Sequence, residues 1–330
     1  MILFLAAFAV SAGAFERQTH GPDAPDFEAP QGIVNGDVED GFPAAVGVGA
    51  GGFTICSASL ITPRMLLTAA HCGDGLPPEL VTSVGEAYFG TDAANPDHTL
   101  GFVDYISHPE YAELNGFFLG ENDVGIGVLD GDAPVDPIWF RTEALGDEDL
   151  DAEILSVGFG ITDSSGVGGG TKRSALLTVD EIDDMFVISR SNTNDNSANI
   201  CSGDSGGPQY YQLEDGTWEQ WSVHSWGDSR CLSESGSTRT DIVQDFIFEQ
   251  IELVHGTTDR CEIWGLYGDG VCDANCDLAD ADCLVTTSGS EDGDDDDDED
   301  GAGCGCSTAS PLGALGGSLV GLAALARRRS

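Results

Sequence analysis

The chain has 330 residues, of which 41% are hydrophobic and 45 are glycine, enough for one large domain or two smaller ones. Its 58 acidic residues far outnumber its 12 basic ones, giving a formal net charge of -46 at pH 7. That charge excludes binding to the phosphate backbone of a nucleic acid, because like charges repel. Ten cysteines in local clusters favour disulfides and therefore an oxidising compartment.

The N-terminal segment is typical of an exported protein. Residues 1–10 are almost wholly apolar, and Ser-Ala-Gly-Ala at 11–14 offers the small residues at which leader peptides are cleaved. We therefore expect residues 1–14 to be a secretory signal peptide, although the basic region that usually opens one is missing. Residues 15–32 are polar and contain three prolines, which predicts an extended, poorly ordered segment.

From Ile33 onward, short apolar runs alternate with glycine, aspartate and proline. This texture favours an antiparallel sandwich or barrel over an alternating α/β fold. The clearest predicted strands are 44–48, 54–61, 124–129, 154–161 and 218–223. Residues 241–253 differ, because their apolar residues recur at helical spacing and predict an amphipathic helix that closes the domain: Ile242, Val243, Phe246, Ile247 and Ile251.

Three polar residues next to predicted strands have the chemistry of an activated nucleophile. Ser205 lies in Gly-Asp-Ser-Gly-Gly-Pro (203–208), where the glycines indicate a tight turn or a close approach of the backbone. A serine hydroxyl is a poor nucleophile unless a base takes its proton and a third group orients that base. His71, in Thr-Ala-Ala-His-Cys, is the candidate base, and Asp123, directly before the strand at 124–129, is the candidate orienting acid.

These three segments, in the order histidine, aspartate, serine, resemble the signatures of chymotrypsin-type (trypsin-like) serine proteases over residues 33–255. The resemblance implies an all-β chymotrypsin-like fold, a double six-stranded β-barrel with a C-terminal helix. It also implies an endopeptidase that acts on protein or peptide substrates and requires no cofactor for catalysis. By resemblance, Ser205 attacks the scissile carbonyl, His71 is base and then acid, and Asp123 fixes the imidazole tautomer. Backbone amides of Gly203 and Ser205 form the oxyanion hole.

Further residues carry the same resemblance. The segment Ile33-Val34-Asn35-Gly36 resembles the N-terminus that activating cleavage creates in this family, where the new α-amino group pairs with the acid before the serine, here Asp204. Residues 15–32 are then a propeptide. The bond before Ile33 lacks a preceding basic residue, so we expect an activating protease that is not trypsin-like. The implied disulfides are Cys56–Cys72 and Cys201–Cys231.

The resemblance also locates residues that would bind substrate. Ser225-Trp226-Gly227 would pair with the substrate backbone as an added strand. Asn199 stands where trypsin-like enzymes carry an acid for Lys or Arg, so trypsin specificity is not expected. His224 and Ser202 resemble the residues with which glutamyl endopeptidases bind a carboxylate, which predicts a preference for acidic residues. A histidine that lines a generic pocket is the alternative.

Residues 256–285 form a separate small unit whose cysteines, rather than a core, must supply order. Its sequence resembles the Lin-12/Notch repeat-like units of extracellular proteins, and its aspartates are candidate Ca²⁺ ligands. A disulfide-bonded spacer with solvated acids is the alternative. The cysteines, whose pairing the sequence leaves open, are Cys261, Cys272, Cys276 and Cys283. The aspartates are Asp269, Asp273, Asp277, Asp280 and Asp282.

The remaining sequence is a predicted tail. Residues 286–303 form an acidic linker, since nine of the ten residues at 291–300 are acidic. Residues 304–330 combine Cys-Gly-Cys, an apolar run and three arginines, which resembles a myxobacterial-type C-terminal sorting signal. A plain membrane anchor is the alternative.

Together these features predict a protease that is secreted or displayed at the outer surface of a bacterium. A separate sorting protease would process its tail, and no nucleic acid would be a partner. Two other functions stay open for the same fold. One is a catalytically silent homologue that acts as a surface binding module, and the other is an esterase.

Overall fold

The computed structural model describes residues 33–113, 120–162, 166, 168–191, 198–273, 276 and 278–284. The predicted signal peptide (1–14), propeptide (15–32), acidic linker (286–303) and C-terminal signal (304–330) lie outside these residues, as does Asp277. All described residues belong to one compact unit. In the part of the chain that the structure describes, no helix is long and apolar enough to cross a membrane.

The N-terminal half forms a closed, antiparallel, six-stranded barrel with the strand order β2-β3-β4-β9-β6-β5. Side chains of β4 alternate between two cores: Leu66 packs inside the barrel, whereas Met65 and Leu67 pack towards the C-terminal helix. A strand buried on both faces reads as an apolar run in sequence, as the first three residues of β4 do. The strands are β2 (Ala45–Ala50), β3 (Phe53–Thr62), β4 (Met65–Thr68), β5 (Glu86–Phe89), β6 (His98–Ser107) and β9 (Gly125–Leu129).

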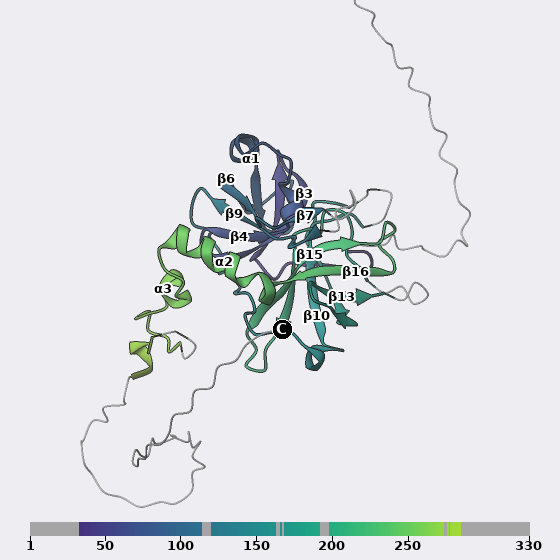
Figure 1. Ribbon diagram of the computed structural model, residues 1–330. Helices are drawn as coiled ribbons and strands as arrows, with labels where there is room; N and C mark the ends of the chain where they lie inside the picture. The colour runs from purple at the N-terminus through teal and green to yellow at the C-terminus, as the bar shows by residue number, and fades with distance from the viewer. Residues whose placement is uncertain are drawn as a thin grey trace, which may run out of the picture. The chain divides into compact units, whose positions relative to one another are not determined.

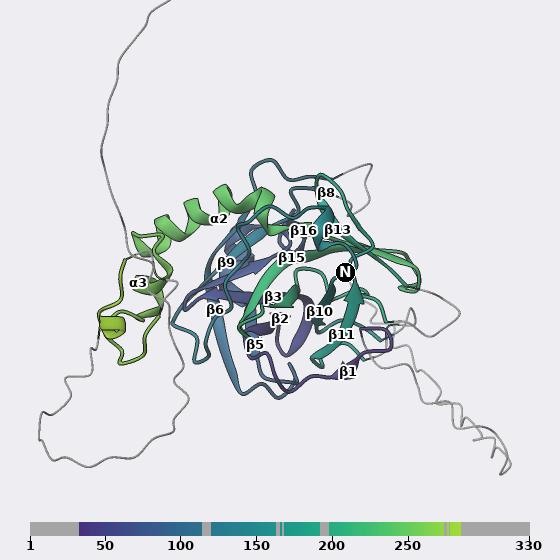
Figure 2. The same ribbon diagram turned by 90° about the horizontal axis from the view of Figure 1, so that it is seen from below.

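The second half, joined by β1 from the N-terminal segment, forms an antiparallel eight-stranded sheet with the order β1-β11-β10-β14-β15-β16-β13-β12. Figure 2 shows β1 and β11 towards one edge of this sheet and β16 and β13 towards the other. The all-β, chymotrypsin-like fold is as expected. Beyond six longer strands, two-residue strands, β1 and β12, extend the two edges of this sheet. A two-residue strand has no periodicity that a sequence can reveal. The bounds are β1 (Asp37–Val38), β10 (Glu153–Gly158), β11 (Arg173–Thr178), β12 (Glu181–Ile182), β13 (Phe186–Arg190), β14 (Pro208–Gln212), β15 (Trp218–Gly227) and β16 (Glu234–Arg239).

The expected C-terminal helix is confirmed as α2 (Thr240–His255), which lies beside β4 and β9 of the barrel (Figure 1). Its buried residues Val243, Ile247 and Ile251 pack against the outer face of those strands, and Gly256 ends it in the left-handed conformation that favours glycine. The other elements are α1 (Pro78–Val84), α3 (Arg260–Trp264), the short strands β7 (Ala112–Glu113) and β8 (Gly120–Glu121), and the 3₁₀ turns η1 (Ala70–Cys72), η2 (Asp147–Asp149) and η3 (Ala281–Leu284).

The small cysteine-rich unit is crosslinked internally. Its pairing, which the sequence left open, is Cys261–Cys276 and Cys272–Cys283. Asp259 caps α3 by accepting hydrogen bonds from the first backbone amides of that helix. The indole of Trp264 lies edge-on to Trp139, with the ring centroids 5.8 Å apart, so the unit packs on the segment that connects the two halves of the protein.

Candidate active site

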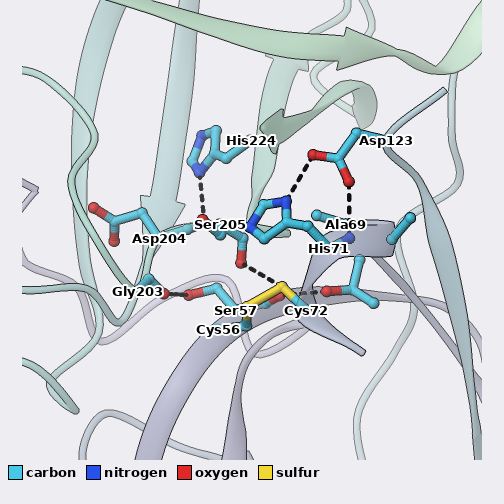
Figure 3. Close-up of a disulfide and its surroundings, with 12 residues drawn as sticks. Cys56, Ser57, Ala69, His71, Cys72, Asp123, Gly203, Asp204, Ser205 and His224 are labelled. Carbon is cyan, nitrogen blue, oxygen red and sulfur yellow. Dashed lines mark hydrogen bonds and ion pairs between the residues drawn. A yellow bond between two sulfur atoms is a disulfide. The ribbon is translucent and has the colours of Figure 1, made fainter. Parts of the chain in front are cut away.

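His71 and Asp123 meet where two paired strands end. His71 lies in η1, directly after β4, and Asp123 precedes β9, which pairs with β4. The carboxylate of Asp123 is fully buried. Its Oδ2 lies 2.7 Å from His71 Nδ1, and its Oδ1 accepts a hydrogen bond from the His71 backbone amide at 3.0 Å (Figure 3). The two contacts fix both the position and the plane of the imidazole ring.

Two further residues support this pair. Ser225 was expected to contact the substrate backbone, and its hydroxyl donates to Asp123 Oδ2 at 2.6 Å. Tyr105 donates to the Ala69 carbonyl at 2.5 Å, which braces the turn before His71. Tyr105 could not be singled out from the sequence, because the residues that accommodate its ring, such as Gly73, are distant in the chain.

Ser205 lies in a turn that only glycine-rich sequence can adopt. Gly203 has φ +94 and Gly206 has φ +82, in the region that disfavours side chains. A Cβ on Gly203 would also lie 2.9 Å from the Gly160 Cα atom. The Ser205 carbonyl accepts a hydrogen bond from the Ser57 amide at 2.8 Å, and the Ser57 hydroxyl donates to the Gly203 carbonyl at 2.9 Å. The barrel therefore holds the turn from both sides of the serine.

Ser205 and His71 line the same cavity of about 500 Å³, and Figure 3 shows the imidazole between Asp123 and Ser205. Two disulfides border the cavity, Cys56–Cys72 beside His71 and Cys201–Cys231 beside the serine turn. The structure thus brings together the three residues for which the sequence predicted nucleophilic chemistry.

Asp204 is a fully buried carboxylate. Its oxygens accept hydrogen bonds from the backbone amides of Gly160 and Cys201, both at 2.8 Å. Burial nevertheless raises the pKa of Asp204 to about 7, against the opposing effect of these two bonds and of the Arg173 charge. Gly158 and Gly160 must be glycine here, because a Cβ on either would come within 2.6 Å of the carboxyl group.

The segment that follows the predicted cleavage point, beginning at Ile33, is buried next to the turn that carries Ser205. Ile33 is 1% exposed, and Val34 packs with Cys201 and Cys231. The Val34 carbonyl accepts a hydrogen bond from the Asn199 amide at 3.1 Å.

The predicted substrate-binding residues divide into two groups. Ser202, Ser225, Trp226 and Gly227 line the cavity together with the catalytic candidates. Asn199 and His224 are not among its lining residues and are fully buried. The sequence did not single out Ile200 and Asp228, which also line the cavity.

His224 is neutral at neutral pH. Burial lowers its pKa to about 4. Its Nδ1 lies 3.1 Å from the Asp204 carbonyl oxygen (Figure 3). Because a carbonyl can only accept, Nδ1 carries the ring proton.

Three of the four candidate calcium ligands that the structure describes accept hydrogen bonds from backbone amides of the same unit. Asp280 accepts from the amides of Asp273 and Asp282, Asp282 accepts from Gly270, and Asp269 accepts from Val271. The fourth, Asp273, has a buried Oδ2 with no hydrogen-bond partner among the described residues. Among the described residues, the group with metal-like spacing is Cys56, His71 and Cys72. Its two thiols form a disulfide, so they offer no thiolate to a metal.

Comparisons of the sequence with known proteins identify the family of this chain. The sequence model of the family described as Trypsin matches residues 33–247, which is well over half of the chain. The chain is also 26% identical over 200 residues to the urokinase-type plasminogen activator of Gallus gallus, a match that covers 53% of this chain and 45% of that relative. It therefore spans less than half the length of that protein. The chain belongs to the trypsin family of chymotrypsin-type serine proteases.

Proposed function

We propose that this protein is a serine endopeptidase that cleaves protein or peptide substrates through an acyl-enzyme. The observation that carries the proposal is the contact of buried Asp123 with His71, 2.7 Å, beside Ser205 in one cavity. Ser205 Oγ attacks the scissile carbonyl while His71 Nε2 takes its proton, and His71 then protonates the leaving amine. Asp123 holds the proton on Nδ1, and the amides of Gly203 and Ser205 stabilise the oxyanion.

The protein is a zymogen that a separate protease activates by cleavage before Ile33. The raised pKa of buried Asp204 supports this proposal, because an ionised carboxylate in that position lacks sufficient compensation. Cleavage would create an α-ammonium group on Ile33, whose side chain is already buried. Pairing of that group with Asp204 would favour the ionised carboxylate and stabilise the turn that carries Ser205.

The protein is exported and is either released or held at the outer surface of a bacterium. The four disulfides among the described residues support an oxidising compartment. A sorting protease that processes the tail, and calcium in the cysteine-rich unit, remain proposals that rest on the sequence.

Trypsin specificity is not part of the proposal, because Asn199 brings no charge to pair with a basic side chain. A preference for acidic residues stays a prediction. It depends on His224, which is neutral in this structure.

A fluorophosphonate probe tests the catalytic proposal on protein that begins at Ile33. We expect stoichiometric labelling of the wild type, none of Ser205→Ala, and unchanged labelling of Ser83→Ala, whose exposed serine lies on α1. Folded wild type that takes no label would favour the silent binding homologue. Labelled protein that hydrolyses esters but no peptide would favour the esterase.

A further inference from the structure

The side chain of Ser57 joins three separate segments around the turn that carries the nucleophile. Ser57 lies on β3, and its hydroxyl donates to the Gly203 carbonyl at 2.9 Å (Figure 3). The same hydroxyl accepts a hydrogen bond from the Phe159 amide at 2.9 Å. Ser57 is 1% exposed and is not among the residues that line the cavity. Any effect of Ser57 on the substrate must therefore pass through its neighbours.

The turn before the nucleophile has a shape that one peptide rotation would change. The Asp204 amide closes it on the Cys201 carbonyl at 3.0 Å, and Gly203, its third residue, has φ +94, as in a type II β-turn. A type II turn becomes a type I turn when its central peptide rotates by about 180°. The ends of the turn need not move. The central peptide here joins Ser202 to Gly203, so the rotation would reverse the direction of the Gly203 amide.

The direction of the Gly203 amide decides whether the oxyanion has its two donors. Gly203 and Ser205 both line the cavity, and their amides are the proposed donors. The Ser202 carbonyl accepts a hydrogen bond from the Ile161 amide at 2.9 Å. Because the carbonyl and the N–H of one trans peptide point in opposite directions, this contact directs the Gly203 N–H away from Ile161. A rotated peptide would instead present the Ser202 carbonyl oxygen, which repels an oxyanion.

The Ser57 hydroxyl opposes that rotation from two sides. It fixes the carbonyl of Gly203, the residue whose φ must change. It also holds Phe159, the first of three consecutive residues whose amides bind around the turn. The amides of Phe159, Gly160 and Ile161 donate to Ser57 Oγ, Asp204 Oδ1 and the Ser202 carbonyl, respectively. One hydroxyl thus connects β3, the segment that anchors Ser202, and the turn itself.

The backbone of Ser57 is held independently of its side chain. Its amide donates to the Ser205 carbonyl at 2.8 Å, and its carbonyl accepts from the Thr68 hydroxyl at 2.8 Å. A substitution that removes only the hydroxyl therefore leaves the contacts that keep β3 against the turn.

We propose that Ser57 is a positioning residue for the oxyanion site, whose hydroxyl keeps the Gly203 amide directed at the negative charge that develops on the substrate. The proposal rests on the hydrolase function above and adds to it a side chain outside the three catalytic motifs. The oxyanion forms on the way to the acyl-enzyme and is absent from the bound substrate. An interaction made only in the transition state changes kcat and leaves KM in place.

Ser57→Ala tests the proposal by steady-state kinetics on protein that begins at Ile33. The substrate is whichever member of a peptide and ester series, varied at the residue before the cleaved bond, the wild type turns over fastest. We expect kcat to fall ~10-fold or more, with KM within ~2-fold of the wild type. Complete loss of one oxyanion donor lowers kcat by about 10²–10³, so the effect should not exceed that range.

Ser59→Ala is the matched control. Ser59 lies two residues further along β3 and is fully buried, and its hydroxyl forms a hydrogen bond with the Tyr210 hydroxyl at 2.6 Å. This variant also removes a buried hydrogen bond between the barrel and the second half, but not one at the turn. Both variants should unfold at lower urea concentration, whereas only Ser57→Ala should lose kcat. An unchanged kcat in Ser57→Ala, or equal losses in the two variants, overturns the proposal.

Two inhibitors built on the same peptide separate the oxyanion site from the rest of the cavity. Ser205 Oγ adds to the carbonyl carbon of a peptide aldehyde, the serine proton passes to His71, and the former carbonyl oxygen becomes the oxyanion. A reduced-amide peptide carries CH₂–NH in place of the scissile amide and has no such oxygen. Ser57→Ala should bind the aldehyde more weakly by the factor lost in kcat/KM, and the reduced amide as tightly as the wild type does. Equal weakening of both inhibitors contradicts the proposal.

Fluorophosphonate labelling keeps this inference distinct from the hydrolase function. Wild-type protein that neither labels nor turns over any substrate overturns both, whereas an active wild type with an equally active Ser57→Ala overturns only this inference. If Ser57→Ala does not fold, the crystal structure of the wild-type aldehyde adduct decides. The Ser57 hydroxyl should then bond to the Gly203 carbonyl while the Gly203 amide contacts the inhibitor oxygen. A hydroxyl that bonds elsewhere in the adduct overturns the proposal.

Discussion

Two buried carboxylates order the backbone of the site: Asp123 beside His71, and Asp204 beside the turn that carries Ser205. Asp123 has no exposed surface, yet it contacts the backbone and ring of His71 and the hydroxyl of Ser225. Asp204 in turn holds the amides of Gly160 and Cys201 on either side of the serine turn. Each carboxylate orders backbone that the chemistry needs, but for Asp204 the two hydrogen bonds offset the cost of burial only in part, and its pKa remains raised to about 7.

Replacing Asp123 by asparagine should inactivate the enzyme without unfolding it. An amide can donate to Nδ1, so the histidine would carry its proton on Nε2, where it cannot accept the Ser205 proton. We expect kcat to fall about 10⁴-fold, the effect that this change has in the trypsin-type triad. Steady-state kinetics on a good peptide measure it, with Asp132→Asn as control because that carboxylate is 77% exposed. A loss below 10-fold would mean that Asp123 does not set the tautomer.

The uncleaved chain should lose stability as pH rises from about 4 to 7. An Asp in the unfolded chain ionises near pH 3.9, whereas burial raises the pKa of Asp204 in the fold to about 7. Between these values the folded state binds more protons, so the free energy of unfolding falls as pH rises, by at most about 4 kcal/mol, and then levels off.

Urea unfolding of the uncleaved protein across this pH range measures the effect. Many other acids also titrate there, so Asp204→Asn serves as the reference, and its curve should be flatter by the contribution of Asp204. Parallel curves for the two proteins would show that Asp204 is not destabilised when ionised.

At the scale of elements, the apolar strands were predictable and the polar ones were not. The runs at 44–48, 54–61 and 124–129 correspond to β2, β3 and β9. The predicted strand 154–161 instead ends at Gly158, because Phe159 and Gly160 leave the sheet to bond to Ser57 and Asp204. β16 was missed, because its Glu-Ser-Gly-Ser-Thr-Arg sequence has no apolar pattern, although the strands beside it bury it.

The crosslink Cys201–Cys231 should matter more for activity than for stability. It closes a loop of 30 residues, so replacing both cysteines with alanine should lower the free energy of unfolding by about 3 kcal/mol. The double replacement of Cys272 and Cys283, separated by 11 residues, should cost nearly as much. Only the first pair borders the substrate cavity, so only its removal should also reduce kcat/KM. Equal kinetic effects of both removals would contradict this assignment.

At the scale of the molecule, the site lies where the two halves of the protease domain meet. His71 and Asp123 come from the barrel, whereas Ser205 and its turn come from the second half. Hydrogen bonds from Ser57 of β3 to Ser205 and Gly203 connect them across the chain. The cysteine-rich unit contacts the same domain at Trp139, where the Arg260 guanidinium lies 6.0 Å from the ring centroid, well removed in sequence from the catalytic candidates.

The all-β class, the closing helix and the three catalytic candidates could be predicted from the sequence, because they depend on local periodicity and on short motifs. Which residues share the substrate cavity depends on how distant segments fold together. Asn199 and His224 look like pocket residues in sequence, yet both are fully buried and neither lines the cavity. The pairing of β15 with β16, which sets His224 opposite Ser237, helps to decide this, and strand register is a non-local property that no short segment encodes.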